Sequence, residues 1–171
     1  ALLDVRTTAR NLVFICTPAE AHVELARQCL EAGVSGLFVE KPLSLSMDGI
    51  PELLALAEKT GAVTMGACNM RWAWARNPTA GGVRRRCAWV QIVSRGPLSA
   101  WRSGAIGAYR EHGVLFEAAV HDVDAAVWML GPITECFGSS VTRDAAALGF
   151  VHGANGMSVI AATWGDEIEP E

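Results

Sequence analysis

Three residues of this chain carry side chains suited to moving protons. Lys41 lies in the tripeptide Glu40-Lys41-Pro42, and Glu117 precedes His121 by four residues, the spacing of one helical turn. Histidine is the side chain whose ordinary pKa lies closest to neutral pH, and an ammonium group and a carboxylate complete a set for acid–base work. These residue types predict proton-transfer chemistry.

A short apolar strand is expected to position Lys41. Residues 36–39 are apolar and lead directly into Glu40-Lys41-Pro42, and an earlier apolar strand is expected over 11–16. Open α/β sheets bind their ligands beyond the carboxyl ends of the strands, which is where Lys41 falls. Pro42 ends the strand and favours an extended conformation for the residue before it, so the lysine has a restricted direction.

The first part of the chain alternates between strand and helix patterns. The expected order is strand 11–16, helix 19–32, strand 36–40, helix 48–60 and strand 63–67. Thr17 and Pro18 supply a hydroxyl cap and a proline at the start of the first helix, and Gly33 ends it. Short connections of this kind predict parallel strands joined by right-handed crossovers onto one sheet.

The second part has a different pattern. The expected elements are strand 88–93, helix 114–130, and strands near 133–142, 147–152 and 156–164. Strands joined by short turns pair antiparallel. The predicted fold class is therefore α/β plus α+β: a partial parallel sheet over 1–72, followed by an antiparallel-sheet domain over 73–171.

Composition limits the possible partners and compartments. The 171 residues are 51% hydrophobic and 19% charged, which is typical of a globular protein. The net charge of −4 gives no reason to expect nucleic acid or an anionic membrane as a partner, and the run Arg84–Arg86 is too short to change this. The chain has no apolar run of 18 residues and no charged-then-apolar leader, so neither a membrane span nor a signal peptide is expected.

The cysteine pattern favours the cytoplasm. Five cysteines are an odd number, they are widely spaced, and none forms a C-x-x-C motif. We therefore expect free thiols in a reducing compartment, with Cys16 and Cys68 acting as small core residues because they lie in apolar segments.

Two groups of residues together resemble the glucose-fructose oxidoreductase/inositol dehydrogenase/rhizopine-catabolism family. The first comprises Ile15-Cys16-Thr17-Pro18, His22, Gly33, Val39-Glu40-Lys41-Pro42-Leu43, Gly66, Asn69, Arg71 and Trp72. The second runs from Gly113 to Asp124 and continues through Trp128, Leu130 and Gly131. The resemblance spans roughly residues 10 to 165. The family's G-x-G-x-x-G turn does not occur in the chain, and Glu117 occupies a position that is usually aspartate.

The resemblance implies an oxidoreductase that transfers a hydride between NAD or NADP and a secondary hydroxyl of a sugar, polyol or nucleotide-sugar. It also implies a partial Rossmann-type dinucleotide-binding domain over 1–72 that lacks the Gly-rich first βαβ unit, a partial substrate and oligomerisation domain over 73–171, and a homodimer or tetramer built through the second sheet. The residues support the same chemistry independently, because oxidation of a secondary alcohol needs a base with a pKa near neutrality. We expect His121 as the base, Lys41 as a donor to the same oxygen, and Glu117 as a group that orients the imidazole or holds a substrate hydroxyl. The residues expected to line the cofactor site are Thr17, Pro18, His22, Glu40, Lys41, Asn69 and Arg71.

Other interpretations of the same residues stay open. Lys41 could be an ordinary exposed lysine, and His121 a helix histidine bonded to Glu117 or Asp124. A degenerate relative would use its sheet only for binding or assembly. Glu117, His121 and Asp124 also share one helical face, which with His112 or His152 resembles half of the site of a metal-dependent lyase or hydrolase, although no metal site is expected.

Overall fold

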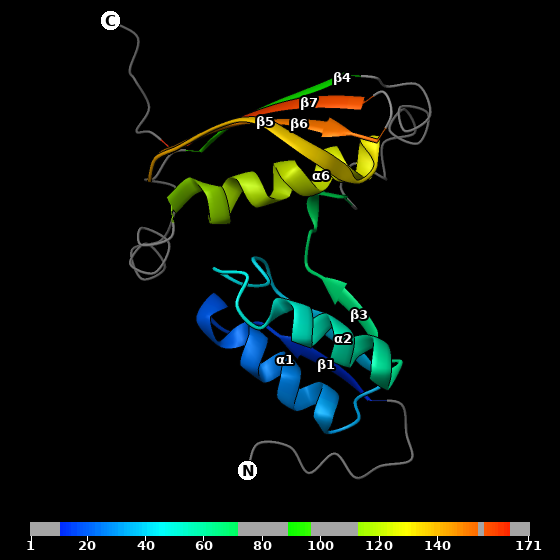
Figure 1. Ribbon diagram of the computed structural model, residues 1–171. Coiled ribbons are helices and arrows are strands. Elements are labelled where there is room, and N and C mark those ends of the chain that lie inside the picture. Colours follow the sequence, from blue (N-terminus) through cyan, green and yellow to red (C-terminus); the bar gives the residue numbers. More distant parts are fainter. Residues whose placement is uncertain (1–10, 72–88, 97–112, 154–155, 165–171) are drawn as a thin grey trace, which may run out of the picture. The chain divides into compact units, whose positions relative to one another are not determined.

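A computed structural model describes residues 11–71, 89–96, 113–153 and 156–164 of the chain (Figure 1). The chain divides into two compact units, Ala1–Ala67 and Cys68–Glu171, and each unit is described by itself. The Arg84–Arg86 run, Trp72 and His112 lie outside the described residues. The domain boundary expected between residues 72 and 73 falls at the edge of a range that is not described.

The first unit contains a parallel sheet of three strands in the order β1-β2-β3. These are β1 (Leu12–Ile15), β2 (Gly36–Val39) and β3 (Val63–Gly66). Ile15 pairs with Val39, and Val39 pairs with Gly66, so the carboxyl ends of the three strands are level at one edge. This confirms the predicted parallel α/β arrangement.

Two helices connect these strands and pack against each other. A 3-10 turn over Ala19–Ala21 leads into α1 (His22–Glu31), and α2 (Ile50–Thr60) follows β2. Gly33 and Gly61 follow the helix ends with φ angles of 79° and 66°, a left-handed conformation that glycine adopts at low cost. The hydroxyl cap expected from Thr17 is not formed, because the cap position of the 3-10 turn is Pro18 and no side chain bonds there.

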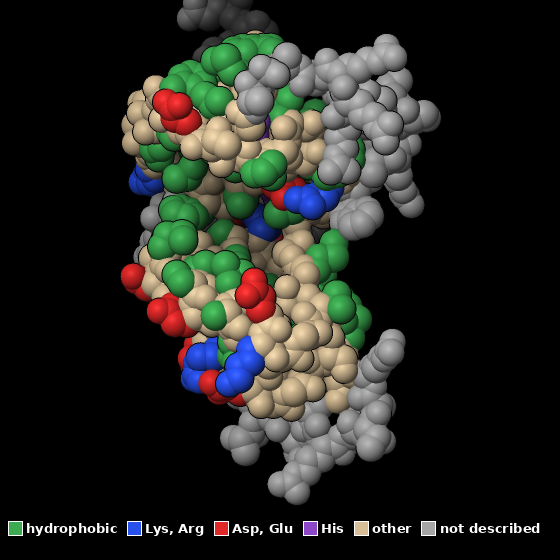
Figure 2. Space-filling view, turned by 45° about the vertical axis from the view of Figure 1, so that its right-hand side comes forward, with side chains coloured by type: hydrophobic (Ala, Val, Ile, Leu, Met, Phe, Trp, Pro, Cys, Tyr) green, Lys and Arg blue, Asp and Glu red, His purple; other side chains and the backbone are tan. Residues whose placement is uncertain are grey.

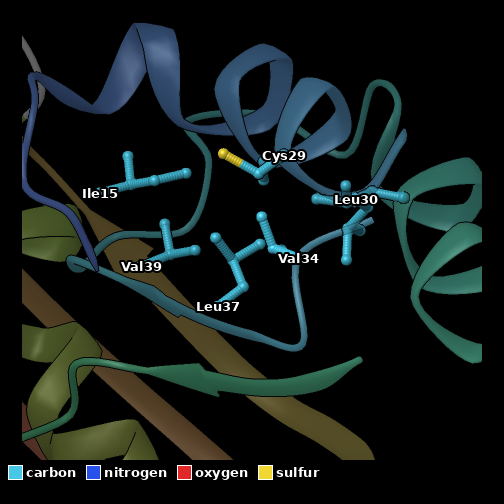
Figure 3. Packing of buried hydrophobic residues seen from close by; sticks show 8 residues of the cluster. Ile15, Cys29, Leu30, Val34, Leu37 and Val39 are labelled. Carbon is cyan, nitrogen blue, oxygen red and sulfur yellow. The ribbon is translucent and has the colours of Figure 1, made fainter. Parts of the chain in front are cut away.

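The core of the first unit lies between α1 and the sheet. Figure 3 shows Cys29 and Leu30 of α1 in one cluster with Val34, which follows the helix, and with side chains of β1 and β2. The buried members of this cluster are Ile15, Ala26, Cys29, Leu30, Val34, Leu37, Val39 and Leu53. Burial raises the pKa of the Cys29 thiol. Cys16, by contrast, is exposed, so the expectation that it is a core residue is wrong: β1 ends at Ile15 and Cys16 lies beyond it.

The second unit contains a sheet in the order β4-β7-β6-β5. Its strands are β4 (Trp89–Gly96), β5 (Ile133–Val141), β6 (Ala145–His152) and β7 (Gly156–Trp164). The last three pair antiparallel, as their short connections predicted. β4 pairs parallel with β7, which makes the sheet mixed. Two parallel strands need a long connection. The chain between β4 and β7 provides it, since it includes a helix and the strands β5 and β6.

One helical segment covers one face of this sheet (Figure 1). It begins with a π-helical turn over Leu115–Ala119 and continues as α6 (Val120–Leu130). Ala125 and Ala126 of α6 pack in one cluster with Ile160 of β7. The sequence predicted a continuous helix over 114–130 and gave no sign of the π-helical turn.

Candidate functional site

Lys41 lies one residue beyond the paired part of the first sheet. The Glu40 N–H donates to the Ile15 carbonyl at 2.8 Å, which extends the pairing between β1 and β2 by one residue. The Lys41-Pro42 peptide bond is cis. The lysine is therefore delivered at the carboxyl edge of the sheet, as the sequence predicted, with the backbone before it fixed to the neighbouring strand.

His22 connects two of the loops at this edge. Its side chain is only 1% exposed, its Nδ1 lies 2.8 Å from the Pro42 carbonyl oxygen, and its Nε2 lies 2.8 Å from the Thr17 carbonyl oxygen. The structure thus brings together Thr17 and His22 of the predicted set and connects them to Pro42, the residue after Lys41. It assigns the imidazole to backbone contacts, a role that the sequence did not indicate because neither partner is a side chain.

Glu117 and His121 come from the same helical segment of the second unit. Glu117 lies in the π-helical turn and is 5% exposed, and the partly buried His121 follows in the first turn of α6, with its Nδ1 atom shielded from solvent. Single π-helical turns within α-helices occur frequently at functional sites. A carboxylate and an imidazole on one rigid segment are suited to orienting a base and moving a proton.

Arg71 binds Asp124 of α6. Its Nε donates to Asp124 Oδ2 at 3.1 Å, and one terminal nitrogen donates to Oδ1. This pairing raises the pKa of Arg71 above its usual value. The guanidinium expected at the cofactor is therefore engaged with the helix, whereas Asn69, two residues earlier, is exposed.

A second carboxylate of α6 is buried toward the sheet. Asp122 accepts a hydrogen bond from the Ser94 hydroxyl of β4. Burial raises the pKa of Asp122, and the hydrogen bond from Ser94 partly opposes this shift. Sequence analysis did not single out Asp122, although its position three and four residues before the core residues Ala125 and Ala126 places it on the buried face of the helix.

His152, the candidate ligand of the metal interpretation, is engaged elsewhere. It is 1% exposed, its Nδ1 lies 2.8 Å from the Gly131 carbonyl oxygen, and its Nε2 lies 2.8 Å from the Ser158 hydroxyl. In the part of the chain that the structure describes, no three His, Cys, Asp or Glu side chains are grouped to hold a metal ion. None of the described helices combines the length and apolar character needed to cross a membrane.

Comparison with known proteins gives a consistent result. Residues 3–67 match the model of an oxidoreductase family with an NAD-binding Rossmann fold. Inositol 2-dehydrogenase of Rhizobium meliloti (strain 1021) is 30% identical over an aligned length of 163 positions, and the alignment covers 90% of this chain and 47% of that protein.

Solved structures show the same fold. A probable dehydrogenase from Thermotoga maritima has a TM-score of 0.72 and 22% identity, covering 90% of this chain and 50% of that one. An oxidoreductase from Agrobacterium radiobacter, in complex with NAD+, L-tartaric acid and magnesium, has a TM-score of 0.73 and 17% identity, covering 94% of this chain and 50% of that one. The chain spans about half the length of these relatives.

Proposed function

We propose that this chain, which belongs to the glucose-fructose oxidoreductase/inositol dehydrogenase/rhizopine-catabolism family, is part of an NAD(P)-dependent dehydrogenase that acts on a secondary hydroxyl of a sugar, polyol or nucleotide-sugar. One observation carries the proposal. The residues that match the NAD-binding family model form a parallel sheet, and Lys41 follows directly at its carboxyl edge. This edge is where open α/β sheets bind their ligands.

The residues at this edge fit a nicotinamide cofactor. β1 and β2 end level with each other, so that Thr17-Pro18 and Glu40-Lys41 start from the same edge of the sheet. These four residues, with the exposed Asn69 that follows β3, are the proposed cofactor-binding positions. The nicotinamide ring supplies hydride transfer when bound, and the protein supplies position and charge. His22 and Arg71, which the resemblance also placed here, would act by holding the backbone and α6 instead.

The proposed catalytic roles follow from what alcohol oxidation requires. A hydroxyl proton must leave as the hydride leaves, and His121 is the proposed base. The Lys41 ammonium would stabilise negative charge that develops on the same oxygen. Glu117 is almost fully buried one turn before His121, where it would orient the imidazole or hold a substrate hydroxyl.

The second sheet is the proposed assembly surface. Trp89 and Val93 of β4 and Met157 of β7 are exposed, while the alternating residues Val90 and Ile92 face the core beneath α6. Exposed apolar patches of this kind mark interfaces, so we propose a homodimer or tetramer formed through this face.

The proposed compartment and partners follow from the thiols and the charges. Cys16, Cys29 and Cys136 are free thiols, which agrees with a reducing cytoplasm. On the face shown in Figure 2, acidic and basic side chains are interspersed among hydrophobic ones, and no large positive patch is visible on its described residues. The proposed ligands are therefore small molecules rather than nucleic acid or membrane.

Bound nicotinamide in the purified full-length protein tests this proposal. The expected result is a nicotinamide absorbance or fluorescence that changes when myo-inositol or another polyol, sugar or nucleotide-sugar is added. Inositol is the first substrate to try, because a relative with 30% identity is an inositol 2-dehydrogenase. A protein that assembles through its second sheet but neither binds nor reduces nicotinamide would instead be a degenerate relative.

A further inference from the structure

Two buried histidines of the chain differ in one chemically decisive respect. His22 in the first unit and His152 in the second are each 1% exposed, and each ring nitrogen lies 2.8 Å from an oxygen atom. One partner of His152 is the Ser158 hydroxyl, which can donate a hydrogen bond. Both partners of His22 are backbone carbonyl oxygens, which can only accept.

This difference determines which hydrogens the two rings need. A neutral imidazole has one N–H and one bare nitrogen. His152 is satisfied in that state, because its Nδ1–H donates to the Gly131 carbonyl and its Nε2 accepts from Ser158. At His22, a neutral ring would leave a nitrogen lone pair facing a carbonyl lone pair in a buried position, which costs free energy. Two N–H groups satisfy both carbonyl oxygens.

We propose that His22 is a positioning residue whose ring, protonated on both nitrogens, binds the Thr17 and Pro42 carbonyl oxygens and so fixes the direction of Lys41. The part concerning Lys41 rests on the proposed dehydrogenase function. His22 itself does not touch the reacting atoms, because both of its nitrogens face the backbone. This assigns to His22 a role different from the cofactor contact that the resemblance implied.

The bonds on either side of Lys41 explain how His22 would act on it. The residue before the lysine is held by the Glu40 N–H bond to the Ile15 carbonyl, at 2.8 Å. The residue after it is held by the bond from His22 Nδ1 to the Pro42 carbonyl, and Nε2 connects this loop to Thr17. The lysine backbone is therefore fixed on both sides, once through the sheet and once through the imidazole.

Nuclear magnetic resonance on the full-length protein with 15N-labelled histidine tests the protonation directly. In the folded protein at neutral pH, we expect one-bond N–H couplings at both ring nitrogens of His22 and at Nδ1 alone of His152, as their hydrogen-bond partners require. The variants His22→Gln and His152→Gln assign the two signals. A His22 ring with only one protonated nitrogen would overturn the proposal, even in an active dehydrogenase.

Kinetics then separate positioning from a purely structural role. With myo-inositol and NAD as the probe substrates, His22→Leu is expected to lower kcat by roughly tenfold or more, because small displacements of a catalytic group can cost up to ~100-fold in rate. His22→Gln, which keeps two N–H donors, should restore part of kcat. The matched control His152→Leu should lower Tm and leave kcat of the folded enzyme unchanged. Equal kcat in the wild type and His22→Leu would overturn the positioning role.

The two proposals can fail separately. If His22→Leu does not fold, the resonance measurement on the wild-type protein still decides whether both nitrogens donate. A doubly protonated His22 in a protein that never reduces nicotinamide would support the link between the two loops and contradict the dehydrogenase function.

Discussion

Arg71 and Asp124 are 53 residues apart in the sequence and form a two-point ion pair within the second unit. The segment that leaves β3 is thereby attached to α6, the helix that carries His121. Asn69, two residues before Arg71, keeps an exposed side chain. We therefore propose that this ion pair supports the neighbouring cofactor-binding position at Asn69.

Neutralising either partner should weaken this attachment. We expect Asp124→Asn to lower the free energy of unfolding by about 1 kcal/mol. The expected loss is small because the Arg71 side chain is 39% exposed, so that solvent screens the charge. A double-mutant cycle with Arg71→Met, measured by chemical denaturation, should give a coupling of about 0.5–1 kcal/mol.

The exposed pair Arg143 and Asp144 is the control for this cycle. It makes the same kind of contact at 3.2 Å, but both side chains are largely solvated. We expect no measurable coupling there. If the two cycles give the same result, the Arg71–Asp124 pair has no special role in holding the segment after β3.

Asp122 should make stability depend on pH. Burial raises its pKa above that of the unfolded chain, so the fold favours the protonated carboxyl. This stabilising contribution is fully present below the unfolded pKa of about 3.9 and is lost as the pH rises through the folded value. Asp122→Asn should therefore raise Tm at neutral pH, and the difference should shrink on acidification. Thermal unfolding followed against pH measures it.

The exposed Glu135 of β5 provides the comparison for Asp122. Glu135→Gln removes a carboxylate charge without a burial effect, so its Tm should follow the wild type at every pH. A Tm advantage of Asp122→Asn that persists unchanged below the unfolded pKa would mean that packing, rather than ionisation, causes the difference.

A charge on the exposed face of the second sheet should break the proposed assembly. Val93→Asp introduces a carboxylate at a position that is 56% exposed, on the same face of β4 as Trp89. Light scattering of the full-length protein at micromolar concentration should show a dimer or tetramer for the wild type and a smaller species for the variant. Leu54→Asp, at a 55% exposed position of α2, should leave the mass unchanged. A wild-type monomer would remove the claim.

Glu117 offers a test of whether the proposed active site still performs the family's chemistry. The resemblance places an aspartate where this chain has the longer glutamate, and one methylene moves a carboxylate by about 1 Å. Glu117→Asp should preserve or raise kcat with the substrate of the full-length enzyme, whereas Glu117→Gln should lower it by roughly tenfold or more. If Glu117→Asp is as inactive as Glu117→Gln, the site has adapted to a different chemistry.

Most of the fold was predictable from local signals. A run of largely apolar residues predicted the strand over 156–164, and Gly33 and Gly61 marked the ends of α1 and α2. These signals act over a few residues, because strand propensity and helix capping depend on the backbone and on near neighbours.

The remaining features depend on contacts between distant segments. The sequence did not predict that β4 pairs parallel with β7, because pairing partners are chosen by the whole sheet. The carbonyl partners of His22 were equally unpredictable, since every residue has a carbonyl group. Arg71 and Asp124 were each identified as polar residues near the site, and their partnership became visible only in the folded chain.

The most direct test of the proposed function is turnover by the full-length protein with and without the Lys41 ammonium group. Reduction of bound nicotinamide by a polyol, sugar or nucleotide-sugar should be measurable in the wild type. In Lys41→Met, kcat should fall by roughly a hundredfold or more, because the group that stabilises developing charge is lost. Nicotinamide should stay bound, because the other proposed cofactor-binding residues, Thr17, Pro18, Glu40 and Asn69, are kept. Unchanged turnover in Lys41→Met, or a wild-type protein that reduces no nicotinamide with any of these substrates, would contradict the account.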